Sequence, residues 1–308
     1  MNRALFVGCA VAIAWGIRGD FGGYLGAMYP GAVLGLAFGY STGQRALLAW
    51  LPLLGIASGL AIAAGGEMSY GILHGYAKSD TLINYSYGYL MLFCQGAAWG
   101  IYGCAAIGLV LERRRLTTVE WASAFASVYL GGFLLYWLVV DVAAFDVNPP
   151  RSNLSIAHFG GAVALFIWLV ASGRRVGVRA AVFGFFGFGI AMFLGRLLEM
   201  WSFQLPIPNS GNWNVNEVTV GFLGAFIFTY GMHGYELPEP LNGKSGHVSF
   251  VSVFSILFVM AGIPLRHRLR LLKPESHLEP WAGRFEQYGV EDPQAWPPFI
   301  VQLLDVVC

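Results

Sequence analysis

The chain alternates between continuous apolar runs and short polar segments. The runs are continuous rather than alternating, which disfavours an outer-membrane β-barrel. Because a helix needs roughly 20 apolar residues to cross a hydrocarbon core about 30 Å thick, the pattern predicts an all-α, polytopic transmembrane bundle over residues 1–265 with about nine spans. We expect these helices at about residues 4–17, 23–40, 46–64, 86–111, 121–140, 157–172, 180–198, 217–233 and 248–265.

The polar segments between the runs are of two kinds. Those after even-numbered runs are short and basic, with Arg45, residues 113–115 and residues 174–179, and the positive-inside rule places them in the cytoplasm. Arg3 places the N-terminus there too, and the remaining segments, rich in glycine, aromatic and acidic residues, then face outward. Nine spans would also put the tail outside, whereas its RHRLRLLK start (266–273) favours the cytoplasm. A re-entrant segment, a missed span or a last helix that disobeys the rule would each explain this conflict.

Two glycine motifs suggest an internal repeat. GAAWGIYG (96–103) and GAFIFTYG (224–231) share their spacing from Gly-Ala to Tyr-Gly. They predict parallel repeats at residues 1–116 and 117–234 with a ninth helix appended, and many transporters bind their solute between such repeats. Membrane helices rich in glycine, alanine and aromatic residues also match one another by composition, so both interpretations stay open.

Small residues recur every four positions in the second run. Gly23, Ala27, Gly31, Gly35 and Gly39 predict a ridge that lets another helix backbone approach closely. We interpret this ridge as a packing seam rather than a ligand site.

Composition supports a membrane protein. Hydrophobic residues make up 56% of the chain and charged residues 11%, whereas soluble domains carry roughly 25% charged residues. The lipid bilayer is therefore the expected partner, and a net charge of +1 gives no reason to expect nucleic acid. The three lysines lie outside the runs and no CxxC, HExxH or Walker A pattern occurs, so we expect no cofactor and no metal. The tail at 266–308 is polar and amphipathic.

Charged and polar residues on the outward side are the candidates for a site. A charge at membrane depth costs about 2.5–3.5 kcal/mol on insertion scales, so a retained charge has a partner or a function. Arg196 and Glu199 can pair at a spacing of three, and glycines around Arg18 and Asp20 allow a non-helical turn. The candidate solute-binding residues are Arg18, Asp20, Glu67, Tyr70, Asp141, Arg196, Glu199, Trp213, Asn214 and Glu217.

An amide-rich segment precedes the predicted helix at 217–233. Asn214 or Asn216 would cap this helix, and Trp213 would lie at the membrane interface. Alternatively, Trp213 and Tyr70 would wall a pocket in which asparagine and carboxylate groups hold a polar solute.

Three functions are compatible with these residues. The first is a transporter or solute-binding protein with an extracytoplasmic polar site for a small polar or anionic solute. The second is a non-catalytic subunit of a larger membrane complex or homo-oligomer. The third, less favoured, is a membrane-embedded enzyme with Glu67 or Glu199 as acid or base. In each case the outward charges could instead be structural ion pairs at helix ends.

Three motifs resemble those of a known group of proteins. The segments WGIRGDFGG, GGEMSYG and GNWNVNEVTVGF, spread over about residues 10–235, resemble the IRGxxG, GGxMxYG and NW…E motifs of uncharacterised bacterial multi-pass membrane proteins. The chain departs from that pattern at Asp20 and Gly23, where the family has glutamine and histidine. The resemblance implies a bacterial cytoplasmic membrane and no known activity.

Overall fold

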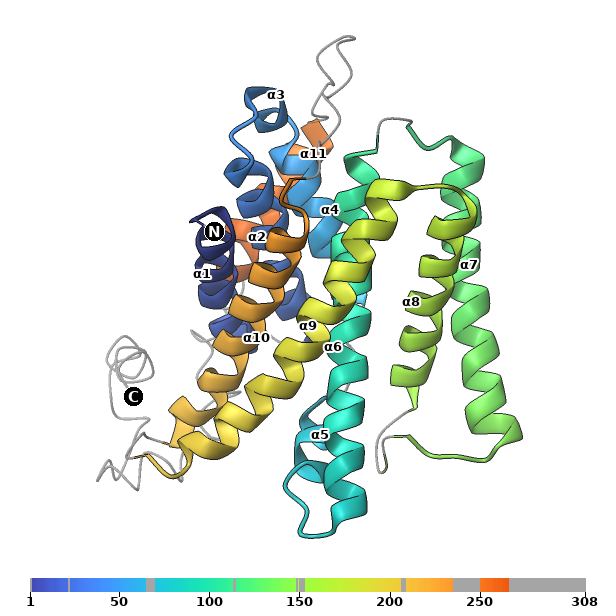
Figure 1. Ribbon diagram of the computed structural model, residues 1–308. Coiled ribbons are helices and arrows are strands. Elements are labelled where there is room, and N and C mark those ends of the chain that lie inside the picture. Colours follow the sequence, from blue (N-terminus) through green and yellow to red (C-terminus); the bar gives the residue numbers. More distant parts are fainter. Residues whose placement is uncertain are drawn as a thin grey trace. The chain divides into compact units, whose positions relative to one another are not determined.

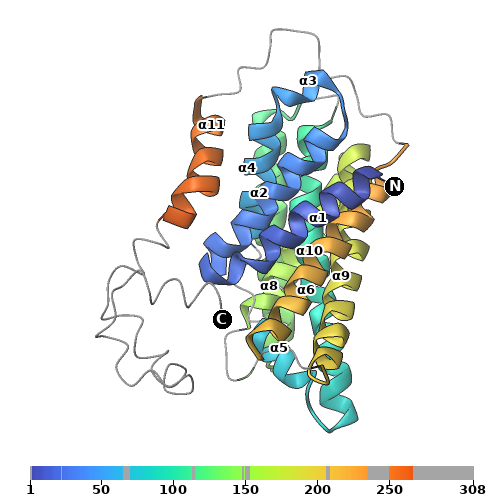
Figure 2. The same cartoon turned by 90° about the vertical axis from the view of Figure 1, so that its left-hand side faces the viewer.

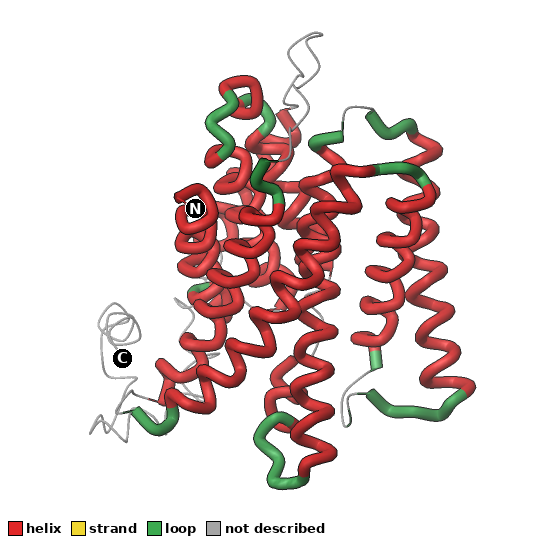
Figure 3. The backbone as a smooth tube through the Cα atoms, viewed as in Figure 1, coloured by secondary structure: helices red, strands yellow, loops and turns green. Residues whose placement is uncertain are grey.

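The described part of the chain is helical throughout its regular structure. The computed structural model describes residues 2–21, 23–64, 70–112, 115–147, 149, 153–205, 209–234 and 250–265, and these residues contain no strand (Figures 1 and 3). The helices are α1 (Asn2–Gly16), η1 (Arg18–Phe21), α2 (Gly23–Ser41), α3 (Arg45–Leu48), α4 (Leu51–Ala64), α5 (Tyr70–Tyr76), α6 (Leu82–Val110), α7 (Thr118–Tyr136), η2 (Trp137–Val142), α8 (Leu154–Ala171), α9 (Arg175–Ser202), α10 (Asn209–Gly231), α11 (Phe250–Leu257) and η3 (Phe258–Gly262). Residues 1–259 form one compact unit and residues 260–308 a second, of which only 260–265 are described.

Four of the described helices are long and apolar enough to cross a bilayer. They are α6, α7 continued by η2, α8 and α9, and they bear out the expected helical membrane protein. A helix covers most of each of the nine predicted ranges, but α1 with 15 residues and α4 with 14 are shorter than a full crossing requires. The count of nine spans therefore stays a prediction.

One helix boundary differs from the sequence prediction in a way that matters for the site. Helix α10 begins at Asn209 rather than near Glu217, so the amide-rich segment lies inside the helix and the predicted cap at Asn214 or Asn216 is wrong. Asparagine is a weak helix former, which favoured a later start. Asn212 and Asn216 are buried, and their spacing of four puts them on one face of the helix.

The predicted glycine seam of α2 packs against α4, which confirms its structural role. A Cβ added at Gly31 would lie 2.8 Å from the carbonyl oxygen of Ser58, and one at Gly35 would overlap the carbonyl of Leu54. Figure 2 shows α2 beside α4 and α1 beside α10, in agreement with the contacts between these helices. Small residues therefore set how closely these backbones approach.

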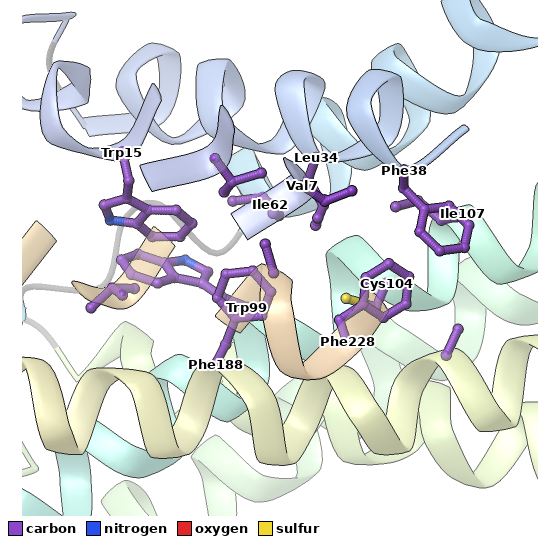
Figure 4. Packing of buried hydrophobic residues seen from close by; sticks show 14 of the residues in the cluster. Val7, Trp15, Leu34, Phe38, Ile62, Trp99, Cys104, Ile107, Phe188 and Phe228 are labelled. Carbon is purple, nitrogen blue, oxygen red and sulfur yellow. The ribbon is translucent and has the colours of Figure 1, made fainter. Parts of the chain in front are cut away.

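The longest helices, α6 and α9, cross at a second glycine contact. Gly100 and Gly184 face each other so closely that a Cβ on either one would overlap the backbone of the other. Beside this crossing, Trp15 of α1 packs on Trp99 and Phe188, with ring centroids 5.5 and 5.6 Å away (Figure 4). This contact ties α1 to the centre of the bundle.

The helix contacts differ between the two halves of the chain. Helix α2 packs along α4, whereas α8 and α9, the corresponding pair, touch over far fewer residues. Helix α7 packs mainly on α8 and exposes most of its apolar surface. The predicted repeat therefore stays a prediction.

Charged residues hold the N-terminal end of α9. The Glu112 carboxylate accepts a hydrogen bond of 2.9 Å from the backbone N–H of Val176, which leaves α6 and α9 adjacent where the α7–α8 hairpin begins and ends. Arg174, predicted to be cytoplasmic, is buried and pairs with Glu120 of α7 at 2.6 Å. The basic segments at this end thus also serve as structural ties.

Candidate functional site

The chain leaves α1 beside the middle of α6. At 1.5 Å per residue, the 15 residues of α1 span about 22 Å. The next turn, η1, brings the Arg18 guanidinium carbon to 5.7 Å from the ring centroid of Trp99, a residue 11 positions (99 to 110) before the end of the 29-residue α6. The sequence predicted this turn at the outer end of the first span. Instead, non-helical backbone lies deep alongside a spanning helix, because α1 stops short and Gly26 of α2 lets the carbonyl of Arg18 come close.

Arg18 forms a buried ion pair there. Its Nη2 donates to Glu217 Oε1 of α10 at 2.8 Å, and the two residues are 4% and 2% exposed. The guanidinium carbon also lies 5.9 Å from the ring of Trp15, so two indole faces and one carboxylate surround the cation. Cation–π contacts strengthen when they are desolvated, which helps to hold this arginine at depth.

A second buried pair lies toward the C-terminal end of α9. Arg196 Nη1 is 2.8 Å from Glu199 Oε1, as their spacing of three predicts. Glu199 Oε2 also lies 3.0 Å from Nδ1 of His74, whose backbone carbonyl accepts a 3.2 Å bond from Arg196 Nη2. All three side chains are buried, so α5 and α9 are joined by charged groups.

Helix α10 connects the two pairs. Asn216 Nδ2 lies 3.0 Å from His74 Nε2, and an amide N–H can only donate, so Nε2 accepts and the proton resides on Nδ1, which donates to Glu199. Burial lowers the pKa of His74 below its usual value, and the bond to Glu199 opposes this only in part. The imidazole is therefore neutral near pH 7. The next residue along α10 is Glu217, the partner of Arg18.

We call these residues the paired-charge network. Two arginines and two carboxylates balance one another, and neutral imidazole and amide groups bridge them. The six members are Arg18, His74, Arg196, Glu199, Asn216 and Glu217.

The structure brings together half of the predicted site residues. Four of them belong to the network, and a fifth, Trp213, lies with its ring centroid 4.8 Å from that of His74. Asn214 and Asp141 are exposed, so they do not join the buried network, and Asp141 lies instead in the π-helical turn η2. The side chains of Asp20, Glu67 and Tyr70 lie outside the described residues.

Sequence analysis missed two members of the network. His74 was expected in a loop, yet it lies on α5, 3% exposed, and contacts both α9 and α10. Its apolar neighbours Ile72 and Leu73 were the available signal for burial. Asn216 was expected to cap a helix. Its Oδ1, like that of Asn212, is a buried acceptor without a hydrogen-bond partner among the described residues.

The described residues include no group of three or more histidine, cysteine or acidic side chains that could hold a metal ion. The network is therefore best described by its hydrogen bonds and ion pairs. Comparisons with protein-family models, with curated proteins and with solved structures find no match to this chain.

Proposed function

We propose that the chain is a transporter or solute-binding protein of the bacterial cytoplasmic membrane, and that the paired-charge network takes up a small polar or anionic solute. The observation that carries this proposal is the break between α1 and α2, which places Arg18 beside the middle of a spanning helix. Irregular backbone at membrane depth occurs where it is buried in protein or lines a cavity. In many transporters, interrupted helices of this kind form the solute site.

The chemistry of Arg18 suits an anion. A guanidinium presents a planar fork of N–H donors that matches a carboxylate or phosphate, and Glu217 already occupies one side of that fork. A solute carboxylate can take the place of the Glu217 carboxylate while Trp15 and Trp99 keep the guanidinium in position. The protein's own carboxylate thus marks the position of the solute's.

The enzyme hypothesis gains less from the geometry. Glu199 is paired with Arg196 and accepts a hydrogen bond from His74, and both contacts stabilise its charged form. That arrangement suits a carboxylate that positions its neighbours better than one that donates a proton to a substrate.

The exposed surface of α7 favours a second candidate, a subunit of a membrane complex. Phe125, Tyr129 and Phe133 follow one another at a spacing of four and are each at least 60% exposed. Lipid or a second copy of the chain would cover them equally well. The mass of the purified protein in nanodiscs, measured by light scattering, separates a monomer from an oligomer.

Binding and uptake of defined anions test the transporter proposal. We would add lactate, succinate, glutamate or inorganic phosphate to the purified protein, record the thermal shift, and then measure uptake of the radiolabelled anion into proteoliposomes. We expect at least one anion to stabilise the protein and to be taken up, and Arg18→Gln to abolish both effects. The matched control is Asp80→Asn, which changes an exposed acidic side chain. Absence of binding and uptake for all four anions would refute the proposal for small anions.

A further inference from the structure

We infer that each negative charge of the solute enters with one proton, with Glu217 binding the proton and Arg18 binding the anion. This inference rests on the proposed function and specifies its coupling ion. The ion pair between η1 and α10 is then an exchange site in which a solute carboxylate replaces a protein carboxylate.

The first step of the argument is charge balance. The described network holds two arginines and two carboxylates and is neutral when His74 is neutral. An anion that joined it alone would leave one buried charge uncompensated, and such a charge costs several kcal/mol. A proton taken up by one carboxylate removes that cost, so entry of the anion and protonation favour each other.

The second step identifies the carboxylate. Arg196 and Glu199 lie one helical turn apart on α9, so no movement between helices separates them, and His74 holds the second oxygen of Glu199. The Arg18–Glu217 pair instead joins the short turn η1 to another helix. Only this pair can open by a displacement of one element relative to the other.

The surroundings of Glu217 are consistent with the exchange. Arg18 faces it from η1. The described charged and titratable groups bonded to its neighbour Asn216, directly or through one side chain, are His74 on α5 and Arg196 and Glu199 on α9. Helices α1 and α6 contribute indole rings to the arginine rather than charges. Once Glu217 is protonated, its nearest described charge is therefore the arginine that the anion binds.

The exchange conserves atoms and charge. The Arg18 Nη2–H hydrogen bond passes from Glu217 Oε1 to an oxygen of the solute, and a proton from water binds the freed carboxylate. On release of the solute, Glu217 returns that proton to water and pairs with Arg18 again. No covalent bond other than the O–H bond forms or breaks.

Proton uptake by the wild-type protein tests the inference directly. In weakly buffered detergent solution, addition of the lactate, succinate, glutamate or phosphate that binds should raise the pH of the medium by the equivalent of one proton per negative charge bound. The apparent Kd for a monoanion should rise about tenfold per pH unit while Glu217 is ionised in the free protein, as linkage of one proton requires. Binding without proton uptake would overturn the inference and leave the proposed function standing.

Glu217→Gln supplies the second arm. The amide has the size of a protonated carboxyl group and keeps an oxygen acceptor, so this variant should bind the same anion with a Kd that does not change with pH and without proton uptake. Asp80→Asn should retain the wild-type pH dependence. If Glu217→Gln folds, as its thermal transition would report, and still takes up a proton with the anion, Glu217 is not the proton carrier. If neither protein binds any of the four anions, the proposed function itself fails.

Discussion

The Arg18–Glu217 pair allows a quantitative test of whether the two charges depend on each other. Their side chains are 5% and 2% exposed, with 2.8 Å between Nη2 and Oε1. At an effective dielectric constant of 20, two unit charges at that separation attract by about 6 kcal/mol, and much of this offsets the cost of removing both charges from water. Removal of one partner leaves that cost uncompensated. We therefore expect Arg18→Met and Glu217→Leu each to lower the free energy of unfolding by about 3–5 kcal/mol.

The double variant distinguishes coupling from simple loss of packing. Because it removes both charges, it should be less destabilised than the sum of the two single variants by about 2 kcal/mol or more. Reversible unfolding in detergent by sodium dodecyl sulfate, followed by tryptophan fluorescence, provides the measurement. Strictly additive effects would refute the reasoning, because they would show that the two residues do not interact in the folded protein.

Three further predictions concern other contacts. Gly100→Leu should lower the free energy of unfolding by about 3 kcal/mol or more, because its side chain would overlap the backbone of α9, whereas Gly71→Ala, whose Cβ meets open space, should change it by less than about 1 kcal/mol in the same titration. Burial lowers the pKa of His74 in the folded state, so the unfolded chain takes up the proton first as pH falls. Stability measured from pH 8 to 5 should therefore decline below about pH 6.5, by at most about 1.4 kcal/mol per unit, and His74→Gln should flatten this decline. Glu112→Ala removes an acceptor from the first turn of α9 and should cost about 1 kcal/mol in thermal unfolding, comparable with loss of a helix cap.

Local patterns along the chain predicted much of the helical structure. The spacing of four in Gly31 and Gly35 depends only on helix geometry, and the structure confirms the close contact that it predicted with α4. The pairing of Arg196 with Glu199 follows equally from their separation by one helical turn. Such features need no knowledge of which helices are neighbours.

The network required information that local patterns do not contain. His74 and Glu199 are 125 residues apart, and Arg18 and Glu217 are 199 apart, so only the packing of α1, α5, α9 and α10 brings them together. The depth of Arg18 was also inaccessible, because it depends on α1 ending beside Trp99 in the middle of another helix.

The contact between Glu112 and Val176 has a consequence for the modular construction of the protein. Because the end of α6 and the start of α9 already meet there, a short linker between them would bypass the α7–α8 hairpin altogether. Removing two crossings at once preserves the orientation of every later helix, since an even number of passes returns the chain to the side it left. The hairpin is thus a side branch, and a chain that lacks it would keep all four elements that carry the network in their original sense.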